Sequence, residues 1–134
     1  MEVLEQLKRW VERLRARLGK ATVILYGSYA RGDFNLWSDV DVIIVSEAFE
    51  GTRFTRRWLL IEPTQPPPGV EAVAWTPREA AERLSKPAWR HALSHGCIVL
   101  LDDYSLAPRA CKSIDALIAE LKKRMEALAA RGAH

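Results

Sequence analysis

The sequence of 134 residues has no long apolar run, few cysteines and few amide side chains. It has no run of 18 or more apolar residues, so no membrane-spanning helix is predicted. Its only cysteines, Cys97 and Cys111, lack zinc-like spacing, and two buried thiols are the favoured interpretation. Amides are scarce, with one Asn and two Gln against 14 Arg. This balance is found in heat-stable proteins, so a thermophilic source is expected and a Cys97–Cys111 disulfide is the alternative.

Charge of one sign is also not concentrated anywhere. The 20 basic and 17 acidic residues are mixed along the chain and leave a net charge of +3. A dedicated nucleic-acid-binding domain would gather basic residues in a stripe, so none is predicted. The N-terminus has an amphipathic helical pattern rather than that of a signal peptide, which favours a cytoplasmic location. The length and the 49% apolar content predict one domain over residues 1–134.

Apolar spacing predicts alternating helices and strands. Residues 2–18 carry apolar side chains three and four positions apart and end at Gly19, as an amphipathic helix does. Thr76, Pro77 and Glu79 form the start signal of a later helix. Strands are predicted at 22–26, 39–45, 70–75 and 97–101, helices at 2–18, 76–85, 87–95 and 106–131, and residues 52–62 are ambiguous. The predicted fold class is α/β (α+β), a mixed sheet of about four strands packed with helices, with a core over 20–101.

Two aspartates open the second predicted strand. Side chains alternate along a strand, so Asp39 and Asp41 share one face, about 6.6 Å apart along the backbone. Two carboxylates held this close repel each other unless a cation neutralises them. Magnesium is commonly bound by one or two carboxylates together with substrate phosphates. The pair therefore indicates a magnesium site, although an acidic, solvated strand end is the alternative for an isolated Asp-x-Asp.

A second motif precedes this strand. Gly27 and Ser28 directly follow the strand at 22–26, and Gly27 can take backbone conformations closed to other residues while letting a phosphate approach. Ser28 supplies a hydroxyl and an N–H, and Arg31 supplies a charged donor. These groups suit an anion such as a phosphate, although an ordinary turn is the favoured interpretation of Gly-Ser after a strand when it is taken alone.

Together the two motifs carry a family resemblance. The string GSYARGDFNLWSDVDVIIV, within residues 23–45, resembles the signature of the polymerase-beta-like nucleotidyltransferase superfamily. The resemblance implies a triphosphate, expected to be ATP, on the Gly27-Ser28 turn. It also implies two magnesium ions on Asp39 and Asp41. The short chain looks like the minimal nucleotidyltransferases, which consist of little more than the catalytic palm.

The superfamily usually has a third carboxylate on a later strand, most often Asp. Here Glu71 stands at that position, within the strand predicted at 70–75, and Glu62 is the less favoured substitute. Glu71 is expected to bind metal or to take the proton of the attacking hydroxyl. The departure from Asp leaves open whether the site is fully active.

Minimal nucleotidyltransferases resemble the antitoxin halves of two-component systems whose partner is a HEPN-domain ribonuclease. The resemblance implies transfer of AMP to a tyrosine of that partner. A binding module with a vestigial site and an enzyme that modifies an aminoglycoside-like compound are the alternatives.

For three other features, a structural role is favoured over a functional one. His91 and His95 have a spacing that can hold zinc, but no Glu accompanies them. The tryptophans are expected to pack rather than to stack on a base. The C-terminal helix is expected to pack on the sheet, with a homo-oligomer or partner interface as the alternative.

Overall fold

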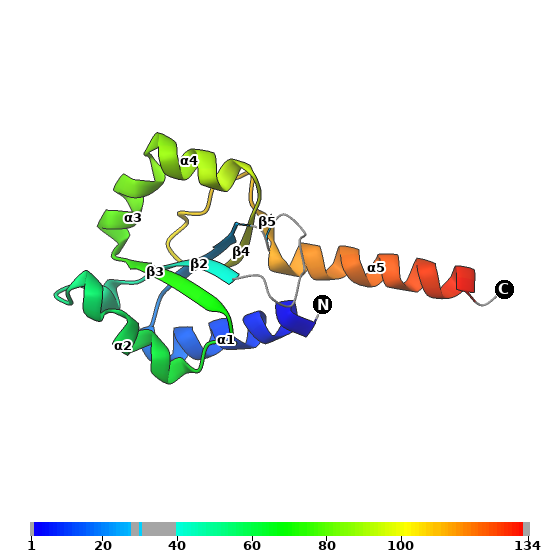
Figure 1. Cartoon of the computed structure of the whole chain (residues 1–134), viewed down its shortest axis with the longest axis horizontal. Coiled ribbons are helices and arrows are strands. Elements are labelled where there is room, and N and C mark those ends of the chain that lie inside the picture. The colour runs from blue at the N-terminus through cyan, green and yellow to red at the C-terminus, as the bar shows by residue number, and fades with distance from the viewer. Residues whose placement is uncertain (1, 28–29, 31–39, 133–134) are drawn as a thin grey trace.

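The computed structural model (Figure 1) describes residues 2–27, 30 and 40–132. Over these residues the chain forms a mixed α/β domain. The longer helices are α1 (Glu2–Leu18), α3 (Pro77–Leu84), α4 (Pro87–Ser94) and α5 (Ile114–Gly132). The strands are β1 (Thr22–Tyr26), β2 (Val40–Val45), β3 (Val70–Trp75), β4 (Cys97–Asp102) and β5 (Lys112–Ser113). Short helical turns between β2 and β3 are η1 (Glu47–Phe49), η2 (Phe54–Arg56), α2 (Trp58–Ile61) and η3 (Glu62–Thr64).

The five strands form one sheet in the order β3-β2-β1-β4-β5. The central strand β1 pairs antiparallel with both β2 and β4, while β3 runs parallel to β2 and β5 runs parallel to β4. The sheet thus has one strand more than the four predicted. The additional strand, β5, has only two residues, Lys112 and Ser113, and neither is apolar, so no alternation marked it in the sequence.

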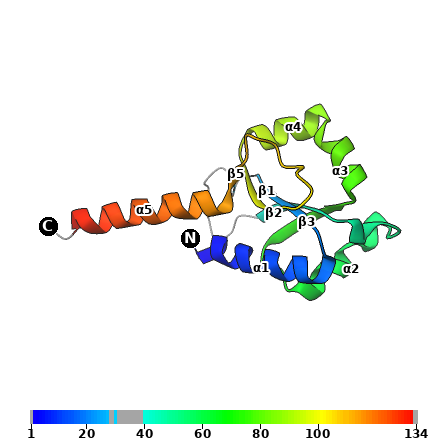
Figure 2. The same ribbon diagram turned by 180° about the vertical axis from the view of Figure 1, so that it is seen from behind.

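Helices cover the sheet on both faces (Figures 1 and 2). The helix α1 lies on one face and buries the apolar stripe predicted for residues 2–18 against the sheet. The first turns of α5 pack on the same face. The helices α3 and α4 lie on the other face. The alternating side chains of β2 divide between the two layers, with Val42 and Ile44 toward α1 and Ile43 and Val45 toward α3 and α4. None of the helices described has the length and apolar character needed to cross a membrane.

A buried arginine fixes the start of α3. Arg57 donates to the carbonyl of Ala74 at 2.9 Å and to Oε1 of Glu79 at 2.6 Å. Glu79 also closes the predicted capping box, since it accepts from the N–H of Thr76 at 2.8 Å while its own N–H donates to Oγ1 of Thr76. Burial alone would raise the pKa of Glu79, but the Arg57 and Thr76 hydrogen bonds and the Arg57 charge lower it to about 2.

The C-terminal region differs from the prediction in two ways. Cys97 and Cys111 form a disulfide across β4 and the start of β5, so the interpretation as two separate thiols was wrong. The last helix begins at Ile114 rather than near 106. The residues between 106 and Ile114 do not continue this helix. The Asp102 carboxylate accepts hydrogen bonds from the N–H groups of Leu106 and Ala107, and the chain then pairs with β4 as β5.

Protonation of Glu79 should destabilise the fold. The pKa of Glu79 is lowered in the folded state. Its contribution to the free energy of unfolding is therefore present above pH 4.5 and is lost as the pH falls toward about 2. We expect Glu79→Gln to lower the free energy of unfolding at neutral pH, with the gap to wild type narrowing between pH 4.5 and 2. Urea unfolding across this range measures it. Glu82→Gln, exposed on the same helix, should show no such gap.

The disulfide should stabilise the domain by restricting the unfolded chain. Its two cysteines are 14 residues apart, and a loop of this size corresponds to roughly 3 kcal/mol. We expect Cys97→Ser/Cys111→Ser to lower the free energy of unfolding by about that amount. Reductant should lower it in wild type and leave the double variant unchanged. Two free thiols per chain in non-reducing denaturant would contradict the bond.

Candidate active site

Three polar side chains stand in one row across the sheet. Tyr26 of β1 pairs with Asp41 of β2, and Asp41 pairs with Glu71 of β3. Residues paired across neighbouring strands point to the same face and lie about 5 Å apart. The neighbours of Glu71 confirm this face, since Val70 and Ala72 pack with the α1 layer. The sheet therefore holds the Asp41 and Glu71 carboxylates side by side, with Asp41 half-buried and Glu71 exposed.

Gly27 closes the row at the end of β1. Its φ of +80° lies in the region that favours glycine, and a Cβ built on it would meet Oδ2 of Asp41 at 2.6 Å. No real Cβ approaches an oxygen this closely, so the lack of a side chain is what admits the carboxylate. Two reasons for glycine coincide here, the backbone conformation and the space.

Tyr26 is a member of the site that the sequence analysis did not propose. Burial raises the pKa of Tyr26, and the negative charges of Asp41 and Glu71 raise it further. Both carboxylates therefore act on one phenol. The ring of Tyr26 packs edge-on against Trp89 of α4, with ring centres 5.5 Å apart. Strand alternation from Ile24 would have placed Tyr26 on this face, but its partner strand is not evident from the sequence.

The other predicted site residues divide into two groups. Ser28, Arg31 and Asp39 lie outside the described residues. Glu62 lies in η3, exposed and away from the sheet strands. Among the described residues, which omit Asp39, no three His, Cys, Asp or Glu side chains form a group that could hold a metal.

The two carboxylates fit a hard divalent cation. Asp41 and Glu71 offer only oxygen donors and lie beside each other, and oxygen donors are what magnesium prefers. The closeness of Gly27 to Asp41 also brings the expected phosphate turn against the expected metal ligand. His91 of α4 and His95, which follows the last residue of α4, are both exposed, with their Nε2 atoms 3.2 Å apart.

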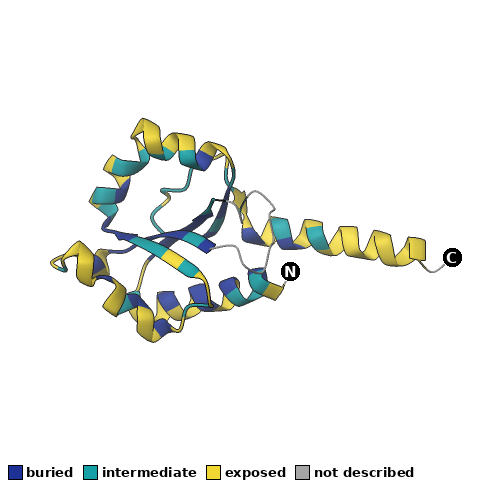
Figure 3. Cartoon of the chain, in the orientation of Figure 1, coloured by how far each residue is buried: buried dark blue, intermediate teal, exposed yellow. Residues whose placement is uncertain are grey.

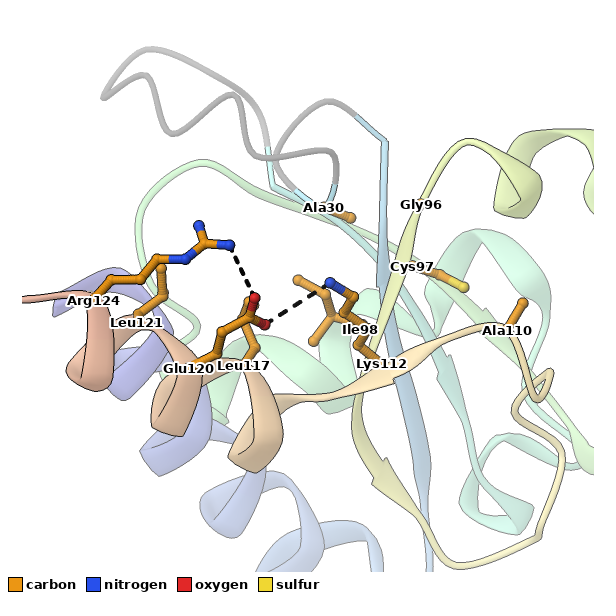
Figure 4. A pocket seen from close by; sticks show the side chains of 10 residues that line it. All are labelled: Ala30, Gly96, Cys97, Ile98, Ala110, Lys112, Leu117, Glu120, Leu121 and Arg124. Atoms are coloured by element: carbon orange, nitrogen blue, oxygen red, sulfur yellow. Dashed lines mark hydrogen bonds and ion pairs between the residues drawn. The ribbon is translucent and has the colours of Figure 1, made fainter.

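A cavity of about 280 Å³ opens beside this end of the sheet (Figure 4). Its apolar wall includes Cys97, Ile98, Leu117 and Leu121, from β4 and α5. Cys97 is the β4 partner of Tyr26, so the cavity begins one strand beyond the row of polar side chains. On its rim Glu120 pairs with Arg124 at 2.9 Å and with Lys112 at 3.9 Å.

Comparison with known proteins identifies the family and the fold of the chain. A family model described as a nucleotidyltransferase domain matches residues 7–92, more than half of the chain. Among solved structures, a protein from Sulfolobus solfataricus assigned as a nucleotidyltransferase is similar over 63% of this chain and 75% of its own. The TM-score is 0.52 and the sequence identity 22%, which indicates a shared fold.

A chain from a crystal structure of a toxin–antitoxin complex with AMP-PNP is also similar to this one. The match covers 95% of this chain and 98% of that chain, at a TM-score of 0.48 and 17% identity. No curated protein sequence matches the chain significantly.

Alanine at position 27 should displace the Asp41 carboxylate. Gly51 provides a matched control, because it has a similar φ of +77° but nothing within 4 Å of the added Cβ. Both Gly27→Ala and Gly51→Ala should lose about 1–2 kcal/mol of stability from backbone strain. Only Gly27→Ala should also weaken binding of ATP with magnesium, by at least about tenfold, or 1.4 kcal/mol.

Calorimetry with and without chelator measures this binding. Equal nucleotide affinity in the two variants would show that the contact between Gly27 and Asp41 does not matter for binding.

Proposed function

Because the chain belongs to the nucleotidyltransferase domain family, we propose that it transfers a nucleoside monophosphate from a nucleoside triphosphate to a hydroxyl acceptor. The observation that carries this proposal is the placement of Asp41 and Glu71 side by side, with Gly27 against Asp41. ATP is the proposed donor and magnesium the proposed metal.

Asp41, Glu71 and Asp39 are the residues we assign to the metal. Bound there, magnesium would neutralise the clustered carboxylates and the charge that develops on the phosphate oxygens. The described residues support two of these three ligands by register, and Asp39 is assigned from the sequence motif.

The remaining chemistry belongs to side chains and backbone of the chain. The turn that begins at Gly27 holds the β- and γ-phosphates, helped by Ser28 and Arg31 in the sequence-based assignment. The acceptor oxygen forms a bond to the α-phosphorus as the bond from that phosphorus to the bridging oxygen breaks, and pyrophosphate leaves. Glu71 thus has two proposed roles, as a metal ligand and as the exposed carboxylate that takes the proton of the acceptor hydroxyl.

The proposed acceptor is a tyrosine of a HEPN-domain toxin, which makes the chain the antitoxin. This assignment rests on the resemblance to antitoxin-type minimal nucleotidyltransferases. The structure is compatible with an acceptor on another protein, because Glu71 is exposed at the end of the sheet where the cavity also opens. Beyond the family match, the described residues up to 132 add β4, β5 and α5 to the same domain.

Substitution of the carboxylates should separate their roles. Asp41→Asn should abolish transfer, because it removes a metal ligand. Glu71→Gln should slow turnover by about a hundred- to ten-thousand-fold, as expected for loss of a general base, with a smaller effect on nucleotide affinity. Glu71→Asp, the commoner residue of the superfamily, should keep measurable activity. Transfer of label from α-³²P-ATP to the partner protein measures the rate.

Glu50→Gln is the matched control, since Glu50 is an exposed carboxylate that follows η1, beyond the far end of β2. It should behave as wild type. Full transfer by Asp41→Asn would rule out the catalytic assignment.

A further inference from the structure

Most of α5 extends away from the domain. Only Ile114 and Ile118 of this helix are buried, and every residue from 122 to 132 is exposed. Figure 3 shows this outer half free of contact with the sheet layers. Isolated helices of fewer than about 12 residues are marginal in water, so an outer half without packing partners gains little from the domain.

One side of this helix stays apolar along its length. We call Leu117, Leu121, Met125 and Leu128 the α5 strip. They are spaced four, four and three residues apart, which places them on one side of a helix over about 17 Å. Leu117 and Leu121 line the cavity, whereas Met125 and Leu128 are 56% and 65% exposed. The strip is thus a continuous apolar surface that begins in the cavity beside the candidate active site.

Basic residues flank the strip. At 100° per residue, Arg124 and Arg131 fall on one side of it and Lys122 on the other. Arg124 is paired with Glu120 on its side, so Lys122 and Arg131 carry the excess charge. Residues 122–132 contain four basic residues and one acidic residue. Two copies packed strip against strip would bring these excess positive charges together, which is unfavourable. A partner with acidic residues beside its apolar surface would be attracted instead.

We propose that the α5 strip is the docking surface for an amphipathic helix of a partner protein, with Asp and Glu flanking its apolar side chains. A helix fits because the strip is straight, narrow and about three turns long, the shape that one helix presents to another. The partner helix follows the strip inward to the cavity. The docking surface itself does not depend on the proposed function. Only the role of the partner as the acceptor of the nucleotide rests on it.

The test uses the purified product of the adjacent reading frame as the partner. Met125→Asp/Leu128→Asp should weaken its binding to the full chain by at least about a hundredfold, because two apolar contacts are lost and charge is buried. Ala119→Asp/Ala130→Asp places the same charges on the opposite side of α5 and should bind as wild type. Lys122→Glu/Arg131→Glu should weaken binding and reduce its dependence on salt. Calorimetry at two salt concentrations measures all four proteins.

The outcomes separate the surface from the chemistry. Asp41→Asn should bind the partner as tightly as wild type. Strip-dependent binding by the wild-type chain without any nucleotidyl transfer would leave the surface standing and refute the proposed function. Equal binding by the two aspartate pairs, or no binding to wild type, would overturn the docking surface. So would light scattering that shows a wild-type dimer which Met125→Asp/Leu128→Asp converts to monomer, since the strip would then join two copies.

Discussion

The pairing of β2 with both of its neighbours is the constraint on which the candidate site depends. It fixes Asp41 between Tyr26 and Glu71, so that two carboxylates and a phenol stand in one row. Like charges on neighbouring strands destabilise a sheet. Burial is the main cause that raises the pKa of Tyr26, and the negative charges of Asp41 and Glu71 raise it further. The row therefore concentrates negative charge at one end of the sheet.

Away from that row the same face of the sheet is apolar and buried. Beyond Asp41, the same face of β2 continues with Ile43 and Val45, both fully buried under α3 and α4. On this face Trp75 meets Trp89 with ring centres 4.8 Å apart, and Trp89 in turn contacts Tyr26. A chain of aromatic contacts thus runs from the core to the polar row. It restricts the Tyr26 ring beside the carboxylates without adding another charge.

The sequence predicted the parts of this structure that depend on local periodicity. The apolar spacing over residues 2–18 located α1, and the capping signal at Thr76 located α3. Tyr26 was not proposed because its importance comes from cross-strand pairing, which no local pattern reveals. The disulfide and β5 were missed for the same reason, since both depend on contacts between distant segments. The roles of Ser28, Arg31 and Asp39 still rest on the motif alone.

The topology also places the surface on α5 at the same end of the sheet as the candidate site on β2 and β3. The strand β4 begins at Cys97, opposite Tyr26, and neighbouring strands lie about 5 Å apart, so the start of β4 is about 10 Å from Asp41. The disulfide joins Cys97 to the residue before β5, which leads directly into α5. The base of α5 is thereby held at the same end of the sheet as the carboxylates. A helix lying along the α5 strip into the cavity would bring its own chain to that end of the sheet.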